Sequence, residues 1–211
     1  MDIPNDIGAG KSHGLLIYLH GDGGKDYNWF FPKVREVAAK YDLIPVAIMS
    51  PTSNVNGPSW WWDADPNAVF LDHLLKAQFI RRFNIDRSRI IFTGASGGPT
   101  FMNGPWLRYY ASQYRGGAVL FCGGLVQTGL PYRATYGFRE NFKLAYYTGT
   151  KDFLLGGTKA AVEYYRTHGL QATEEYPEGI DHCAFAPYMN RLLDERIEKI
   201  LGKVVIPATN L

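Results

Sequence analysis

The stretch IIFTGASGGPTF (residues 90–101) places a serine in a glycine-rich turn, after a run of strand-forming residues. Gly94 and Gly98 flank Ser96 at a spacing of two residues on each side. The pattern Gly-x-Ser-x-Gly is typical of a nucleophilic serine that stands on a sharp turn between a strand and a helix. Because the pattern is short, the match alone is a hypothesis that the rest of the chain has to support.

The composition predicts one globular domain that covers residues 1–211. The chain is 46% hydrophobic and 20% charged, with a net charge of +2 and no long basic run. These values argue against a nucleic-acid partner and against binding to an anionic membrane surface. No apolar stretch is long enough to span a bilayer, so we expect no membrane span. The first residues lack the pattern of a signal peptide, but a signal removed beforehand would leave no trace, and the compartment stays open.

Apolar runs and amphipathic segments alternate along the chain. We predict strands at 14–19, 43–49, 89–93, 117–122, 143–147 and 172–176. Helices are predicted at 26–40, 67–83, 98–114, 158–168 and 187–201. A polar loop, PTSNVNGPS (residues 51–59), is predicted after the second strand. Strands that are continuous apolar runs, alternating with helices, are typical of a mostly parallel sheet with helices on both faces. The predicted fold is therefore a three-layer α/β fold.

Chemically active residues follow four of the predicted strands. In parallel sheets, reactive groups gather beyond the carboxyl ends of the strands. The glycine-rich segment HGDGG (residues 20–24) follows the first strand, Ser96 the third, Asp152 the fifth and His182 the last. The order serine, acid, histidine is the one expected of an α/β-hydrolase.

Each of these residues has a predicted role. A serine hydroxyl becomes a nucleophile when an imidazole takes its proton, which assigns His182 as the base. Asp152 would hold the tautomer of that imidazole. The backbone N–H groups of Gly97 and Asp22 would form the oxyanion hole.

Alternative interpretations remain for several of these residues. Asp181 is a rival for the acid, although neighbouring residues rarely present their side chains for such a contact. Ser96 could be an ordinary turn residue, and His20 is expected to support the glycine-rich loop. Cys122 and Cys183 lack metal-site spacing, and the sequence leaves open whether they are bridged. We predict no metal and no cofactor.

Tryptophans lie in two loops next to the predicted site. Trp60, Trp61 and Trp62 follow the second strand, and Trp29 follows the glycine-rich loop. Aromatic side chains at this edge can form a platform for a planar acyl group or a sugar ring. The alternative is that some of them cover the sheet as part of the core.

Four segments carry a resemblance to a known family. LHGDGG, FNIDRSRIIFTGASGG, GTKD and the late histidine resemble the polyhydroxybutyrate-depolymerase-like branch of the α/β-hydrolases, which includes feruloyl and acetylxylan esterases. The resemblance implies a serine carboxylic ester hydrolase that uses Ser96, Asp152 and His182 and needs no metal or organic cofactor. Its substrates would be aryl, acetyl or short-chain acyl esters, either small molecules or carbohydrate-linked. The absence of a long insertion between the fourth and fifth strands predicts no large lid.

Two other functions remain open on the sequence. A serine peptidase would use the same residues, because a triad and an oxyanion hole also serve amides. A non-catalytic binding module of the same fold would keep the scaffold and lose residues of the triad. The sequence does not indicate an oligomeric state.

Overall fold

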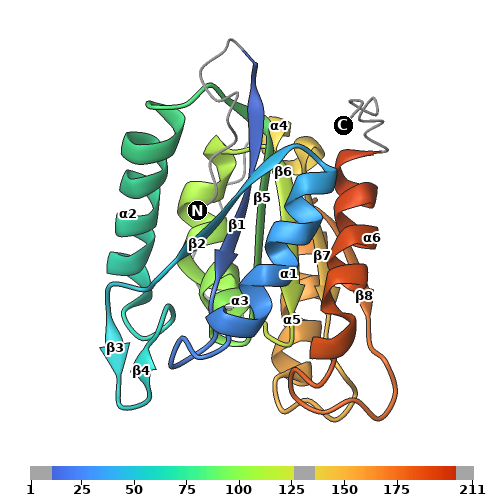
Figure 1. Cartoon of the computed structure of the whole chain (residues 1–211). Coiled ribbons are helices and arrows are strands. Elements are labelled where there is room, and N and C mark those ends of the chain that lie inside the picture. The colour runs from blue at the N-terminus through green and yellow to red at the C-terminus, as the bar shows by residue number, and fades with distance from the viewer. Residues whose placement is uncertain (1–10, 126–135, 203–211) are drawn as a thin grey trace.

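The computed structural model describes residues 11–125 and 136–202. Its centre is a parallel sheet of six strands in the order β2-β1-β5-β6-β7-β8 (Figure 1). The strands are β1 (His13–Leu19), β2 (Leu43–Ile48), β5 (Ile85–Ala95), β6 (Gly116–Phe121), β7 (Phe142–Tyr147) and β8 (Gln171–Glu175).

Helices cover both faces of the sheet and complete the predicted three layers. One face carries α1 (Tyr27–Lys40) and α6 (Met189–Leu201). The other face carries α2 (Ala64–Leu74), α3 (Gly97–Phe101) and α5 (Leu155–Thr167), with π-helical segments at Leu75–Ile80 and Met102–Tyr110. Shorter helical elements are the 3₁₀ turns at Ala111–Gln113 and Ala186–Tyr188, and α4 (Tyr136–Asn141).

The side chains of the central strands alternate between two hydrophobic cores. In β1, Leu15, Ile17 and Leu19 face the core under α2 and α5, whereas Leu16 and Tyr18 face the core under α1 and α6. All five are fully buried. A parallel strand covered on both faces has no solvent-facing side, which explains why its sequence is an uninterrupted apolar run.

The order of the strands reverses between β1 and β5. From β1 the chain moves to β2 on one side, and then crosses back to β5 on the other side. The loops that leave β1 and β5 therefore diverge to opposite faces and open a crevice at the carboxyl ends of the strands. In the register of the sheet, Leu19 at the end of β1 pairs with Gly94 of β5, so HGDGG and Ser96 lie on either side of this crevice.

The predicted helix at 98–114 is interrupted in the structure. Gly104 has non-helical backbone angles (φ −86°, ψ −122°), and Pro105 follows it. A proline inside a helix has no N–H to donate, and it disfavours the helical conformation of the preceding residue. The hydrophobic periodicity of the segment continues across Gly104, so the sequence-based prediction missed this break.

A short antiparallel hairpin, β3 (Ser53–Asn54) and β4 (Gly57–Pro58), forms in the loop after β2. The sequence indicated only a polar loop there. The hairpin contacts the glycine-rich loop, because the N–H of Gly23 donates to the carbonyl of Pro58 at 2.9 Å.

No lid-like insertion occurs in residues 11–125 and 136–202, in agreement with the prediction. Part of the connection between β6 and β7, residues 126–135, lies outside the described ranges. Within those ranges, none of the helices has the length and apolar character needed to cross a membrane.

Candidate active site

Ser96 stands on a tight turn between β5 and α3. Its backbone has a positive φ (φ 55°, ψ −109°), a conformation that non-glycine residues rarely adopt and that surrounding contacts must maintain. Those contacts are the Ser96 N–H, which donates to the carbonyl of Phe121 at 3.1 Å, and the Thr100 N–H and hydroxyl, which donate to the Ser96 carbonyl.

The glycines on either side of Ser96 are required by close backbone packing. A Cβ on Gly98 would lie 2.3 Å from the carbonyl oxygen of Leu19, and one on Gly94 would lie 2.4 Å from the same atom. Neither distance leaves room for a side chain, so only glycine allows the turn to pack against the end of β1. This packing explains the glycines of the Gly-x-Ser-x-Gly pattern in this chain.

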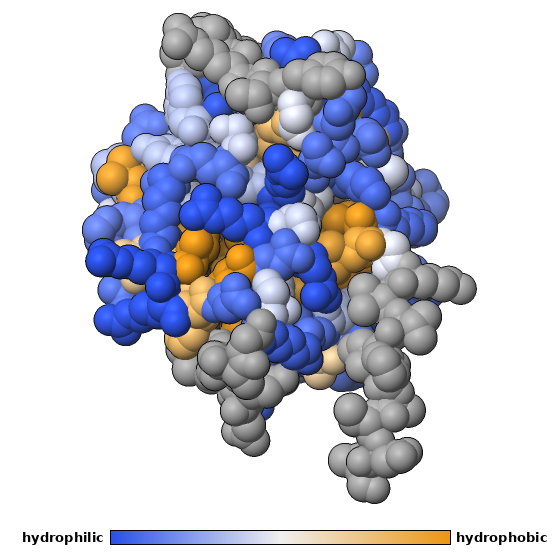
Figure 2. Space-filling model, turned by 90° about the horizontal axis from the view of Figure 1, so that it is seen from above, coloured by the Kyte–Doolittle hydropathy of each residue, from blue (hydrophilic) through white to orange (hydrophobic). Residues whose placement is uncertain are grey.

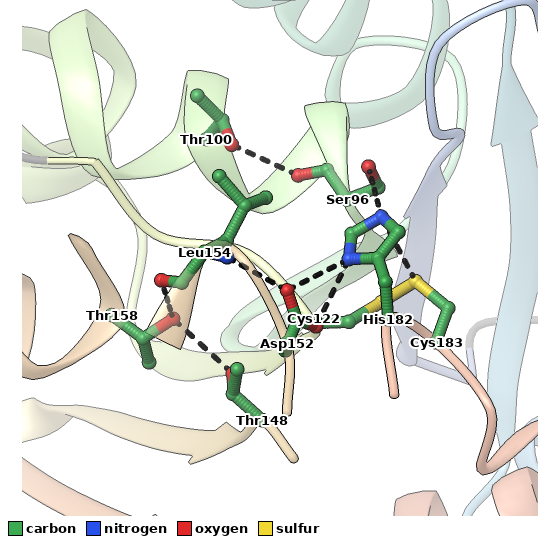
Figure 3. Close-up of polar contacts among 9 residues, drawn as sticks. All are labelled: Ser96, Thr100, Cys122, Thr148, Asp152, Leu154, Thr158, His182 and Cys183. Atoms are coloured by element: carbon green, nitrogen blue, oxygen red, sulfur yellow. Dashed lines mark hydrogen bonds and ion pairs between the residues drawn. A yellow bond between two sulfur atoms is a disulfide. The ribbon is translucent and has the colours of Figure 1, made fainter. Parts of the chain in front are cut away.

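The structure brings together Ser96, His182 and Asp152 (Figure 3). The Nε2 atom of His182 lies 3.0 Å from the Ser96 hydroxyl oxygen, and its Nδ1 lies 2.9 Å from both carboxylate oxygens of Asp152. An ionised carboxylate only accepts hydrogen bonds, so Nδ1 carries the proton and Nε2 is left to accept the serine proton. The Asp152 side chain is fully buried, and the N–H of Leu154 donates to it at 2.8 Å.

The loops that carry Asp152 and His182 are hydrogen-bonded to each other. The N–H of Lys151, which precedes Asp152, donates at 3.0 Å to the carbonyl of Ile180, which lies two residues before His182. A Cβ on Gly149 would lie 2.1 Å from that same Ile180 oxygen, so the loops approach closely only because residue 149 is a glycine. Asp181, the rival acid, is exposed, and it is Asp152 whose carboxylate contacts the imidazole.

A disulfide joins Cys122 to Cys183, which follows His182 (Figure 3). Both cysteines have positive φ angles, 44° and 55°, and Cys122 is fully buried at the end of β6. Cys122, His182 and Cys183 form a group of metal-ligand types whose atoms lie within 4.8 Å of one another. The two sulfurs are bonded to each other, and a metal needs free thiolates, so this group fits a structural role better than a metal site.

The two predicted oxyanion-hole residues, Asp22 and Gly97, line the cavity next to Ser96. A Cβ on Gly97 would lie 3.3 Å from the Asp22 nitrogen, so these two residues are in contact across the crevice. In the described part of the chain, no hydrogen bond uses the N–H of Asp22 or of Gly97. Two free donors beside a nucleophile are the arrangement that stabilises a developing oxyanion.

His20 fixes the orientation of one of these donors. The Ser50 N–H donates to His20 Nε2 at 3.0 Å, so the ring proton is on Nδ1, which donates to the carbonyl of Gly21 at 2.6 Å. That carbonyl belongs to the same planar peptide unit as the Asp22 N–H. The buried imidazole therefore sets the plane that carries the candidate donor.

Asp26 anchors the start of the same loop. Its Oδ2 accepts hydrogen bonds from the Gly21 N–H at 2.9 Å and from the Tyr18 hydroxyl. Burial, together with the negative charge of Asp26, raises the pKa of Tyr18 well above its ordinary value. The Tyr18 hydroxyl therefore keeps its proton at neutral pH and donates a hydrogen bond to Asp26.

A cavity of about 190 Å³ opens above Ser96. Asp22, Trp61, Thr100, Leu125 and Phe153 line it together with Ser96. A smaller cavity of about 50 Å³ shares Trp61, Thr100 and Leu125 with the first one and extends toward Pro105. The side chains around Ser96 thus form a mostly apolar depression with one carboxylate.

The four predicted tryptophans occupy different environments. Trp60 is fully buried in the core and packs on Phe101, which corrects the prediction that it contacts substrate. Trp61 is 40% exposed and lines the cavity. Trp62 packs edge-on against Trp61 at the surface, and Trp29 lies exposed on α1 outside the cavity lining. Roles for Trp62 and Trp29 stay predictions.

Sequence reasoning missed several residues that shape the site. Phe153 packs against His182 with its ring tilted and the ring centroids 4.4 Å apart, and Ser59 donates to the Asp22 carboxylate at 2.7 Å. Asn67 is buried in α2 and donates to the carbonyls of Ser59 and Trp60, which fixes the segment before Trp61. An asparagine on the apolar side of a helix was a signal for such a role.

A larger cavity, of about 520 Å³, lies at the opposite end of the sheet. It is lined by Arg89, Arg115, Glu140 and Lys143, near the amino ends of the strands. This end of the molecule has a largely hydrophilic surface (Figure 2). The lining of this cavity includes no histidine paired with a serine or a cysteine, so the smaller cavity at Ser96 is the candidate active site.

Solved structures with a similar fold include several esterases. A carboxylesterase from Bacillus cereus superimposes with a TM-score of 0.73 at 17% identity, and 89% of each chain is covered. Esterase 2 from Thermogutta terrifontis gives a TM-score of 0.67 at 15% identity, with 96% of this chain and 89% of that chain covered. The chain has the α/β-hydrolase fold.

A phospholipase/carboxylesterase from Dyadobacter fermentans shares the α/β-hydrolase fold, with a TM-score of 0.59 at 17% identity over 87% of this chain and 91% of that chain. No family model and no curated protein matches the chain. The structural similarity to these esterases confirms the fold class predicted from the sequence. The narrower resemblance to the polyhydroxybutyrate-depolymerase-like branch stays a prediction.

Proposed function

We propose that this protein is a serine hydrolase that cleaves carboxylic esters through an acyl-enzyme on Ser96. One observation carries the proposal: His182 Nε2 lies 3.0 Å from the Ser96 hydroxyl, while Nδ1 is held by the buried Asp152. This geometry allows the imidazole to take the serine proton as the hydroxyl oxygen attacks a carbonyl carbon.

The remaining steps use groups already in place. The carbonyl oxygen of the substrate gains negative charge during the attack and accepts hydrogen bonds from the N–H groups of Asp22 and Gly97. The imidazolium then gives its proton to the departing alcohol, which leaves an acyl group on Ser96. Water, deprotonated by the same imidazole, releases the acid and regenerates the serine.

The mostly apolar cavity fits an uncharged acyl group of short to medium length. Trp61, Leu125 and Phe153 supply apolar contact surface around Ser96. Aryl and short-chain acyl esters therefore suit the site, and carboxylesterases with the same fold are consistent with ester cleavage. In the Thermogutta terrifontis structure, esterase 2 is phosphonylated by sarin, which recommends an organophosphonate reagent as a probe of Ser96.

The test compares two serines of the same segment. Ser96→Ala should abolish hydrolysis of p-nitrophenyl acetate and labelling by a fluorophosphonate probe. Ser88→Ala changes a serine at the opposite end of β5, next to Asp86, and should keep both. Circular dichroism confirms that both variants are folded. Persistent turnover or labelling in a folded Ser96→Ala variant would refute the proposal.

A further inference from the structure

The carboxylate of Asp22 lies inside the candidate site, next to the groups that would bind the oxyanion. A Cβ on Gly97 would lie only 2.7 Å from Asp22 Oδ1. The same side chain lines the cavity that contains Ser96. The Asp22 carboxylate therefore packs against residue 97, and the loop brings a negative charge close to Ser96.

Two neutral donors hold this carboxylate in place. The Ser59 hydroxyl donates to Oδ1 at 2.7 Å, and the Trp61 indole N–H donates to Oδ2 at 2.7 Å. Each oxygen keeps further lone-pair capacity for a donor on a substrate. The hydrogen bonds fix the position of the charge and leave it uncompensated by a cation.

No lysine or arginine lines the cavity together with Asp22. Among the ion pairs of residues 11–125 and 136–202, none includes Asp22, and the cavity lining has no lysine or arginine. The other lining side chains are apolar or hydroxyl-bearing. An incoming group therefore meets one solvent-exposed negative charge in a mostly apolar depression.

We propose that Asp22 is a specificity-determining residue that excludes anionic acyl groups and admits neutral or hydroxyl-bearing ones. The inference rests on the proposed ester hydrolysis. An acyl chain that ends in a carboxylate would bring two like charges within several ångströms of each other, whereas a hydroxyl could donate to a free lone pair of Asp22. For an exposed charge at that separation, Coulomb repulsion predicts discrimination of roughly a few-fold to tenfold.

The test uses two substrates of matched length. p-Nitrophenyl butyrate and p-nitrophenyl hemisuccinate differ in that a terminal methyl group is replaced by a carboxylate. We expect the wild type to prefer the butyrate, in kcat/KM, and Asp22→Asn to reduce that preference by roughly a few-fold to tenfold. The substitution keeps the size of the side chain and both contacts. The amide oxygen can accept from Trp61, and the amide N–H can donate to the Ser59 hydroxyl.

A matched control separates the local charge from the net charge. Glu195→Gln removes one negative charge from the exposed surface of α6, far from the cavity lining, and should leave the substrate preference unchanged. A second measurement needs no variant. Raising the salt concentration from about 20 mM to about 500 mM should weaken the butyrate preference of the wild type, because added ions screen the repulsion.

The outcomes distinguish this inference from the proposed function. Equal preference ratios in the wild type and Asp22→Asn, or a wild-type ratio that salt does not change, would overturn the role of Asp22. Failure of the wild type to hydrolyse any neutral ester, with no fluorophosphonate labelling of Ser96, would instead overturn the proposed ester hydrolysis.

Discussion

Cys183, which follows His182 in the chain, is bonded to Cys122 at the end of β6. The bond therefore links the histidine loop to the strand next to β5, which carries Ser96. The two cysteines are 61 positions apart in the sequence. Such a cross-link restricts the unfolded chain and also limits how far the imidazole can move from the serine.

We predict that removal of this disulfide reduces both stability and turnover. For a loop of this length, chain entropy accounts for roughly 4 kcal/mol of the free energy of unfolding. In the double variant Cys122→Ala and Cys183→Ala, kcat for p-nitrophenyl acetate should also fall by on the order of tenfold, because the imidazole is held less well. Urea unfolding and steady-state kinetics measure the two effects.

Dithiothreitol should reproduce these losses in the wild type and change nothing in the double variant, since only the wild type has a bond to reduce. A reduced wild type with unchanged kcat would show that the loop hydrogen bonds hold His182 without the disulfide.

We predict a kinetic role for His20, which has no contact with the reacting atoms. His20→Ala removes the hydrogen bond to the Gly21 carbonyl, so the peptide that carries the Asp22 N–H loses its fixed orientation. Loss of one oxyanion donor in comparable sites costs about a hundredfold or more in kcat, and a misoriented donor should cost at least tenfold. KM should change little, because the cavity lining remains. His73→Ala, at an exposed histidine of α2, is the control and should match the wild type.

Asp152, which contacts His182, and Asp181, which precedes it in the chain, give a paired prediction. Asp152→Asn removes the carboxylate that holds the tautomer of His182, and kcat should fall by on the order of a thousandfold or more. Asp181→Asn changes an exposed acid next to the same histidine and should leave kcat within about twofold of the wild type. The opposite ranking of the two variants would assign the acid to Asp181.

The sequence predicted the sheet and the order of the site residues well, because both depend on local patterns. Buried parallel strands appear as apolar runs, and the topology places their carboxyl ends at one edge whatever the details of the helices. The contact of Ser96, Asp152 and His182 could be predicted from their positions after strands, with no knowledge of distances, and their catalytic roles stay a proposal. Gly94 and Gly98 could be recognised in the sequence, because backbones that pack this closely leave room only for a residue without a side chain.

Other features depend on contacts between residues distant in the sequence, and no local pattern reports them. Trp60 and Trp61 are adjacent in the chain, yet one is buried in the core and the other lines the cavity. Asn67 of α2 donates a hydrogen bond to the carbonyl of Trp60 and so helps to fix the backbone of this segment. Likewise, the contact of Asp22 with Ser59 requires the β3–β4 hairpin, which the sequence indicated only as a polar loop.

The contact between α1 and α6 predicts a pH-dependent part of the stability. Asp194 on α6 accepts hydrogen bonds from Lys40 at 2.7 Å and from the Tyr41 hydroxyl at 2.7 Å. Burial alone would raise the pKa of Asp194, but these two hydrogen bonds outweigh it and leave the pKa below its ordinary value. The stability contributed by the charged carboxylate is therefore fully present above the unfolded-state pKa of about 4, and is lost as the pH falls through the lower folded-state value.

Asp194→Asn should lower the free energy of unfolding by about 1 kcal/mol at pH 7, since the partners are partly exposed and the ion pair is screened. The difference from the wild type should shrink as the pH falls from about 5 toward 3, because the carboxyl of the unfolded state takes up a proton in this range while the native carboxylate still resists protonation. Glu195→Gln, in an exposed pair with Arg191 on the same helix, should differ from the wild type by less than about 0.5 kcal/mol over this range. Urea unfolding at several pH values measures all three proteins, and a gap for Asp194→Asn that stays constant down to pH of about 3 would contradict the lowered pKa.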